Sequence, residues 1–318
     1  MEPFFFFLGG RKFKCLPILF TLILLLAIAA SEIFKIWQNT KVSAEVPLLL
    51  IPTAQAVFHN LFSCIWLLIL LMRKGNGESQ AFKRKKRIED TLDLILSITL
   101  SAAALSAAEA CMYVGVMYLD GELLHPLVST NMIILEYFSS STRALTHTTN
   151  LQRWLSTIVI YVSCALLSLF RLSIPLLVSV PGIICGIASS LLLTIALLMT
   201  ERILPKNYSP ALLNVIFSLS HALFSLIVAV FLGQSISLPN AFDFEYILFP
   251  FICLVMLQAL RYLMFGSILN LYGAQPVAHV AACSSALYLV TSSSVDISSL
   301  VLVAAALTAA YGRNKALV

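Results

Sequence analysis

Long runs of apolar residues, separated by short polar loops, fill almost the whole chain. A helix of about 20 apolar residues crosses the hydrocarbon core of a bilayer, so each run predicts a membrane-spanning helix. The predicted spans are Cys15–Trp37, Val46–Met72, Thr91–Leu119, Leu124–Ser141, Leu155–Phe170, Ile174–Met199, Pro210–Leu232, Tyr246–Leu269, Gln275–Val290 and Ile297–Tyr311.

Composition agrees with this pattern. Hydrophobic residues make up 60% of the 318 residues and charged residues only 11%, and the mean hydropathy is +0.95. A water-soluble domain has an apolar share nearer half. We therefore predict an all-α, polytopic membrane protein with ten transmembrane helices.

One stretch occurs twice. The segment from Tyr272 to Ser294 begins at a glycine-marked turn and continues as a helix of small residues, and it resembles the segment from Gly121 to Thr142. Five identities align at a constant offset, Gly121 with Gly273 among them, and each copy forms the fourth span of a five-span half. This predicts two five-helix repeats, residues 1–171 and 172–318, with the functional site between them.

Loop charges give the orientation. The basic residues of positions 11–14, 73–87, 143–153, 202–206 and 313–315 all fall on one side if both termini are cytoplasmic, as the positive-inside rule requires. An odd number of spans in each half then makes the two repeats inverted. The basic excess of five residues therefore belongs to the cytoplasmic loops, and nucleic acid is not an expected partner.

Several short motifs occur in the order found in one transporter family. They are Thr200-Glu201 with Lys206, Asn214-Val-Ile, the LQAL sequence of residues 257–260, and the tail LTAAYGRNK of residues 307–315. In this order they resemble the drug/metabolite transporter superfamily and, within it, the nucleotide-sugar transporters. The resemblance extends over nearly the whole chain.

The resemblance implies a carrier, not an enzyme. It implies exchange of a nucleotide sugar for a nucleoside monophosphate by alternating access, in the Golgi or endoplasmic reticulum membrane. The expected partners are a small-molecule substrate and membrane lipid, with a homodimer as one possible assembly, and no cofactor or metal is expected. The sequence has no HExxH, GxSxG, P-loop, GxGxxG or CxxC motif, and its seven cysteines lie in or beside apolar runs, as free thiols do.

The chain also departs from the family pattern. The family lysine of the fourth span is replaced within Thr130-Asn131-Met132, and that of the ninth within Val277-Ala278-His279. Glu109-Ala110 replaces an asparagine pair, and Arg261-Tyr262 replaces a glycine pair. Three alternatives therefore stay open: a carrier of the same fold for a different metabolite, a membrane adaptor that no longer transports, and an integral-membrane enzyme.

Polar residues at membrane depth are the candidate ligands of the substrate, because ionisable groups in hydrocarbon usually face a cavity or a partner. The candidate substrate-binding residues are Glu109, Tyr113, Asn131, Asn214, Ser218, Arg261, His279 and Ser284.

Three of the candidates have a structural interpretation as well. Arg261 replaces the family lysines as the phosphate ligand or extends to the membrane surface. Glu109 pairs with Arg261 or makes a helix-packing hydrogen bond, and His279 is capped or packed. Glu136 is expected to reach Arg143 or water. His59-Asn60 and His221 are further polar positions within predicted spans.

The topology can be tested by protease protection of sealed vesicles. Tags placed in the loop of residues 73–87 and at the C-terminus should be cleaved together from the cytoplasmic side, because both carry basic clusters. Protection of one tag and cleavage of the other would contradict the inverted five-span repeats.

Overall fold

The computed structural model describes residues 21–26, 28–30, 50–74, 88–119, 121–138, 150–171, 179–203, 210–231, 249–291 and 296–315. All regular secondary structure within these ranges is helical. Residues 21–26 and 28–30 are the described part of the first predicted span, and the loop of residues 73–87 lies almost wholly outside the described residues. The remaining helices are α2 (Leu50–Lys74), α3 (Ile88–Tyr118), α4 (Gly121–Ser129), α5 (Asn131–Phe138), α6 (Asn150–Arg171), α7 (Val180–Ile203), α8 (Pro210–Phe231), α9 (Phe249–Tyr272), α10 (Ala274–Thr291) and α11 (Ile297–Lys315).

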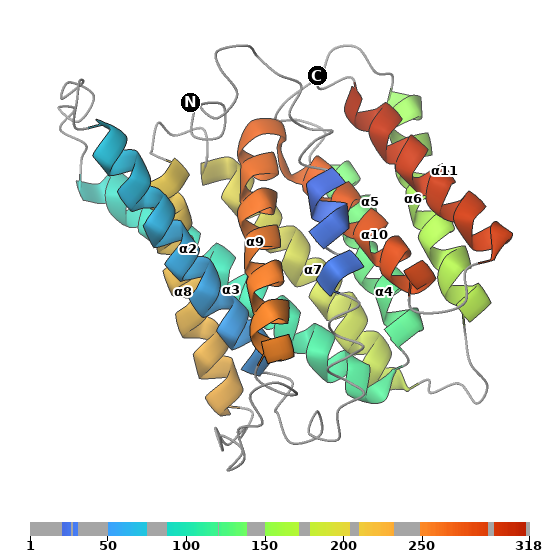
Figure 1. Cartoon of the computed structure of the whole chain (residues 1–318), viewed down its shortest axis with the longest axis horizontal. Coiled ribbons are helices and arrows are strands. Elements are labelled where there is room, and N and C mark those ends of the chain that lie inside the picture. The colour runs from blue at the N-terminus through green and yellow to red at the C-terminus, as the bar shows by residue number, and fades with distance from the viewer. Residues whose placement is uncertain are drawn as a thin grey trace.

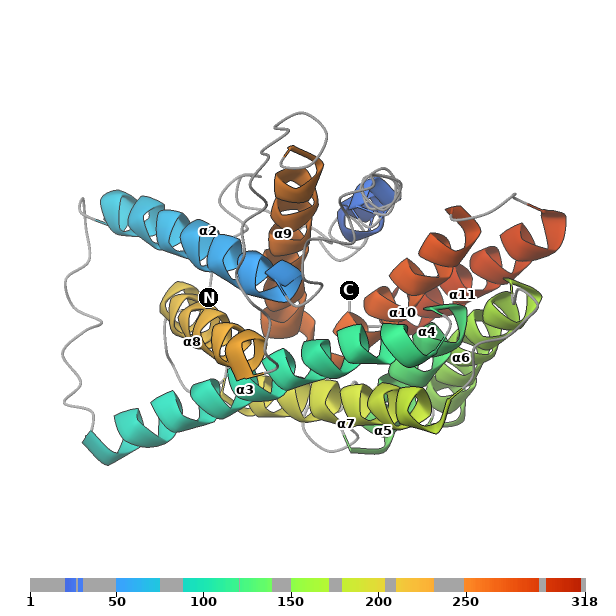
Figure 2. The same cartoon turned by 90° about the horizontal axis from the view of Figure 1, so that it is seen from below.

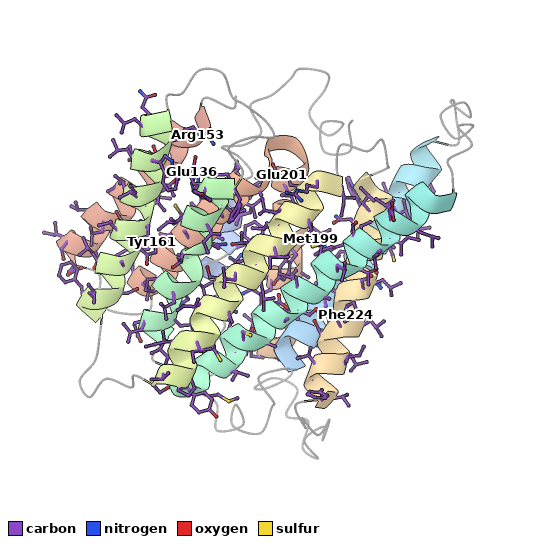
Figure 3. All side chains as sticks on the ribbon, turned by 180° about the vertical axis from the view of Figure 1, so that it is seen from behind. Glu136, Arg153, Tyr161, Met199, Glu201 and Phe224 are labelled. Carbon is purple, nitrogen blue, oxygen red and sulfur yellow. The ribbon has the colours of Figure 1, made fainter. Side chains whose placement is uncertain are left out.

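The lengths and compositions of these helices are those of an all-α integral membrane protein. Five described segments are long and apolar enough to cross a bilayer: Leu92–Tyr118, Leu151–Phe170, Val180–Ile203, Leu213–Phe231 and Phe249–Gly266. Leucine, isoleucine and valine side chains are exposed along the outer faces of the helices, and carbon-rich side chains project outward there in Figure 3. Buried positions include glutamates, histidines and many serines. Such a distribution suits a lipid-facing surface around a partly polar interior.

The helices pack in two groups joined by α7. In one group α2 packs against α8 and α9, and α3 packs against α7 and α8. In the other, α6 packs against α11, α10 and α4. Figures 1 and 2 show the first group at one side of the molecule and the second at the other, with α9 near the centre. Helix α7 contacts α3 as well as α4 and α5, so it connects the two groups.

Small residues allow α3 and α7 to approach closely. A Cβ atom added at Gly182 would lie 2.7 Å from Leu119 Cβ and 3.0 Å from the Tyr118 backbone, so only glycine fits there. Ser189 Oγ on α7 donates to the Ala108 carbonyl at 2.8 Å, and Ser101 Oγ on α3 donates to the Ala196 carbonyl at 2.7 Å. Small residues and interhelical hydrogen bonds are the usual means of helix association in a membrane.

The fourth predicted span is not one helix but two, α4 and α5, which meet at Thr130. In a continuous helix the Thr130 N–H would bond the Pro126 carbonyl, but here it donates to the Leu127 carbonyl at 3.3 Å. The Thr130 hydroxyl donates to the Pro126 carbonyl instead, at 3.2 Å. Proline within α4 removes one further backbone donor. The hydropathy of the segment does not register this break, because most of the residues around it are apolar or small.

The turn between α9 and α10 confirms the predicted glycine-marked turn. Gly273 has a φ of 92°, a left-handed conformation that favours glycine, and its N–H donates to the Leu269 carbonyl at 3.0 Å. A Cβ atom at this position would lie 2.5 Å from Glu201 Oε1 at the end of α7. The α9–α10 turn therefore fits against α7 only without a side chain. Its counterpart Gly121 is the first residue of α4.

Replacing Gly273 by alanine should destabilise the protein. The left-handed backbone alone costs about 1–3 kcal/mol for a residue with a Cβ atom, and the contact with Glu201 adds to this. Thermal unfolding in detergent should show a midpoint lowered by several degrees.

Gly266→Ala is the matched control, because the added Cβ atom would lie 3.3 Å from the flexible Asn214 amide and needs no left-handed backbone. Equal midpoints for the two variants would contradict the geometry of the turn.

Candidate functional site

Four helices bring ionisable side chains together near the middle of their lengths. Glu109 comes from α3, His221 from α8, Tyr262 from α9 and His59 from α2. We call these four residues the Glu109 cluster. A group of this kind at membrane depth is costly to bury and therefore marks a functional site or a strong structural requirement.

Both oxygens of the Glu109 carboxylate have partners. His221 Nε2 lies 2.9 Å from Oε2, and the Tyr262 hydroxyl donates to Oε1. The Glu109 side chain is almost fully enclosed, with an exposed fraction of 5% for the residue. A carboxylate enclosed in this way needs hydrogen-bond partners, and the His221 ring and the Tyr262 hydroxyl supply one for each of its oxygens.

His59 completes the cluster by ring contacts. Its ring stacks on Tyr262 with centroids 5.8 Å apart and an interplanar angle of 23°, and His221 meets the same tyrosine edge-on at 5.8 Å. His59 is 2% exposed, and neither of its ring nitrogens has a hydrogen-bond partner among the described residues. His221 Nδ1 likewise has none in that part of the chain.

Arg261 is the neighbour of Tyr262 on α9 but points to different partners. Its Nη1 donates to Gln258 Oε1 at 2.8 Å, and its guanidinium carbon lies 5.5 Å from the centre of the Phe265 ring. The expected pair between Glu109 and Arg261 is not formed: within the described ranges no carboxylate makes an ion pair with Arg261. Successive residues on a helix are about 100° apart, so Tyr262 and Arg261 cannot both face Glu109.

Tyr113 connects the two charges. It lies one turn from Glu109 on α3, within electrostatic range of both Glu109 and Arg261, and Gln55 of α2 is its neighbour. The carboxylate and the guanidinium are therefore separate but share a neighbour.

Hydroxyl groups fix α8 beside α2 and α3. Ser218 Oγ lies 3.1 Å from Asn60 Oδ1 on α2, and Ser106 Oγ on α3 donates to the His221 carbonyl at 3.2 Å. The Asn214 side chain packs beside Gly266 of α9. These contacts set the position of His221 relative to Glu109.

A second polar cluster joins α5, α6 and α10. Glu136 Oε1 lies 3.0 Å from Arg153 Nε, while Gln275 Nε2 donates to Glu136 Oε2 at 2.8 Å. Thr157 Oγ1 lies 3.3 Å from both Glu136 Oε2 and His279 Nε2. Figure 3 shows Glu136 and Arg153 at the end of the bundle where Glu201 also lies. We call these five residues the Glu136 cluster.

Arg143, the partner expected for Glu136, lies outside the described residues. Among the described residues, Glu136 pairs with Arg153, in the first turn of α6. Glu136 is 2% exposed, so it is enclosed within protein.

The eight candidate residues do not form one site. Glu109, Tyr113 and Arg261 lie in and around the Glu109 cluster, with Ser218 and Asn214 nearby on α8, whereas His279 belongs to the Glu136 cluster. Ser284 Oγ donates to the Val280 carbonyl of its own helix at 2.8 Å, and Asn131 is buried at the start of α5.

Sequence reasoning missed several residues of both clusters. They are Gln55, Arg153, Thr157, Tyr262 and Gln275 in these roles. Tyr262 and Gln275 each lie one helical turn or less from a candidate, which is the signal that could have found them. No three His, Cys, Asp or Glu side chains of the described ranges are placed to hold a metal ion.

Comparisons with known proteins bear on the fold alone. The chain matches no protein-family profile and no curated protein sequence. It is similar to solved structures, including a protein crystal structure that aligns with a TM-score of 0.59 at 13% identity. That alignment covers 92% of this chain and 95% of the other. The same helix arrangement therefore occurs, over almost its full length, in a crystallised protein.

Removing the His221 side chain tests how much the Glu109–His221 contact stabilises the protein. His221→Ala leaves one oxygen of the buried carboxylate without its partner, an effect of about 1–3 kcal/mol or more, and should lower the thermal unfolding midpoint in detergent. Adding Glu109→Gln to this variant should recover part of the loss, because the amide carries no charge.

Glu109→Gln alone completes the double-mutant cycle. Strictly additive effects would show that Glu109 and His221 are not energetically coupled, against the 2.9 Å contact.

Proposed function

We propose that this protein is a secondary transporter of the drug/metabolite type that exchanges a nucleotide sugar, or a related organic anion, for a nucleoside monophosphate. The observation that carries the proposal is the charge balance at mid-depth. Glu109 has His221 and Tyr262 as partners, whereas no carboxylate among the described residues pairs with Arg261.

A partly buried guanidinium at this depth calls for an anion. Its Nε is buried without a hydrogen-bond partner in the described part of the chain, while Nη1 has only the neutral Gln258 amide. A phosphate oxygen would supply both a charge and an acceptor, and arginine binds phosphate with parallel hydrogen bonds. Arg261 would thus take the role of the lysines that the family pattern places in the fourth and ninth spans.

The helix contacts support the inverted repeat within this proposal. A five-span shift exchanges α3 with α9 and α2 with α8, and both α3–α8 and α2–α9 pack together. The same shift exchanges α6 with α11, and these two helices also pack together. The two copies of the repeated stretch, α4–α5 and α10, are in contact as well. Each of these relations is expected of two repeats around one axis.

Alternating access also has a physical basis in these elements. Helices broken near the substrate site are a common feature of secondary transporters, and α4–α5 is broken at Thr130. The Glu136 cluster links α5 and α6 of the first half to α10 of the second. In this scheme the cluster closes the cytoplasmic end, and opening that end separates Gln275 from Glu136. We place the carrier in the Golgi or endoplasmic reticulum membrane, with both termini cytoplasmic.

A carrier for a different metabolite is the second candidate function. The absence of both family lysines favours it, because a phosphate-bearing substrate would depend on Arg261 alone for a permanent charge. An adaptor without transport is the third, and it would retain the packing of both clusters while binding no solute.

Uptake by the reconstituted protein tests these functions. A panel of labelled nucleotide sugars, nucleoside monophosphates, nucleosides and amines should show selective, exchange-dependent uptake of an anion. Arg261→Ala should lower that uptake by tenfold or more, because a charge-assisted hydrogen bond contributes about 1.5–3 kcal/mol, and Arg261→Lys should retain part of it.

Arg202→Ala is the matched control, since Arg202 is exposed in the last turn of α7. Anion uptake that is indifferent to Arg261→Ala would refute the role of Arg261. Selective uptake of a neutral or cationic metabolite would refute the nucleotide-sugar function, and no uptake of any solute would favour the adaptor.

A further inference from the structure

We propose that the Glu109–His221 pair is a proton-binding site, and that it loads one proton when an anion binds at Arg261. The proposal rests on the anion-carrier function above and extends it: the carrier moves a proton together with its anion.

The pair can change its charge without losing its hydrogen bonds. With the proton bound, the His221 imidazolium donates its Nε2–H to Glu109 Oε2, the Tyr262 hydroxyl donates to Oε1, and the pair is neutral. When the proton leaves from Nδ1, the neutral imidazole keeps its Nε2–H and the same donor contact. Glu109 remains a carboxylate, so the pair then carries one negative charge. His221 Nδ1 has no hydrogen-bond partner among the described residues, so no acceptor in those ranges fixes its protonation.

His59 supplies an independent observation. A phenylalanine would stack on Tyr262 as well as His59 does, without burying two polar nitrogens that lack partners in the described residues. Packing alone therefore does not account for a histidine here. A neutral imidazole carries one donor and one acceptor nitrogen and can pass a proton, and His59 lies within electrostatic range of His221. We assign His59 as the relay through which the proton reaches and leaves the pair.

The proton site and the anion site are coupled by charge. The summed charge of Glu109, His221 and Arg261 is zero without the proton and +1 with it. Tyr262 and Arg261 are adjacent on α9, and Tyr113 interacts with both charged ends. A bound proton therefore favours the anion, and by thermodynamic reciprocity a bound anion favours the proton.

The surroundings of Glu109 contain few other titratable groups. His59 faces the cluster from α2, Tyr113 lies beside it on α3, His221 faces it from α8, and Tyr262 and Arg261 come from α9. Helix α7 carries Cys185, which lies beside Gly115, Glu201, which lies at Gly273, and the exposed Arg202. Helix α4 carries Glu122 and His125 and meets α3 at Gly115, beyond Glu109 along the chain.

The first test measures the proton directly, without substrate. The chain has five histidines, so 15N-histidine NMR of the protein in lipid nanodiscs can resolve them, and His221→Asn identifies the signal of His221. This signal should change from imidazolium to imidazole between about pH 5 and pH 8, and Glu109→Gln should abolish that change. Glu122→Gln, which removes a carboxylate outside the cluster, should leave it as in the wild type. One unchanging protonation state of His221 throughout this range would overturn the proton site.

The second test measures coupling in proteoliposomes that contain a fluorescent pH indicator, with UDP-glucose as the anion probe, because its diphosphate keeps a constant charge over the pH range tested. An acidic exterior should accelerate wild-type UDP-glucose uptake several-fold, and about one proton should enter with each UDP-glucose. The uptake that remains in Glu109→Gln should not depend on pH. His59→Phe should keep the wild-type unfolding midpoint but slow proton entry.

The two tests separate the possible failures. UDP-glucose uptake without proton entry overturns the coupling, even if His221 titrates. If no anion of the panel is taken up, the proposed carrier function fails and the coupling fails with it, while the NMR measurement still decides whether the pair binds a proton.

Discussion

The arrangement of the first helix group depends on one constraint, which is the placement of a carboxylate at mid-depth in a low-dielectric bundle. Glu109 is tolerable there only because α8 brings His221 and α9 brings Tyr262 to its two oxygens. These contacts join helices far apart in the sequence, and the hydroxyl of Ser106 fixes the backbone of α8 at the same level. Charge compensation and helix packing are therefore parts of one structural requirement.

The second group of helices meets the same requirement in a different place. Glu136 is enclosed near an end of the bundle, where Arg153 and Gln275 occupy its oxygens. A membrane offers little gain from pressing apolar surfaces together, so close contacts between small residues and polar bonds must hold the helices. The α3–α7 interface, with Gly182 and Ser189, provides the first kind of contact, and the two glutamate clusters provide the second.

Much of the fold follows from apolar runs, whereas the site does not. The runs locate α2, α3 and α6–α11 to within a few residues, because bilayer thickness fixes helix length. The left-handed turn at Gly273 can also be predicted from the sequence, because glycine is the residue that adopts such a backbone conformation most readily. The break at Thr130 cannot be predicted in this way, because hydropathy carries no information on which oxygen accepts a backbone hydrogen bond. The partner of Glu109 was also missed: His221 is 112 residues away, and nothing local selects it over Arg261.

The junction at Thr130 has a mechanical consequence. Bending an unbroken helix stretches several backbone hydrogen bonds at once, but here the Pro126 carbonyl is held by a side-chain hydroxyl that can rotate away. Helices α4 and α5 are thus two short rods connected by a joint whose stiffness resides largely in one threonine. Helix α5 carries Glu136, and α4 and α5 both pack on α6 and α7. A change of angle at Thr130 would therefore move the buried carboxylate relative to α4.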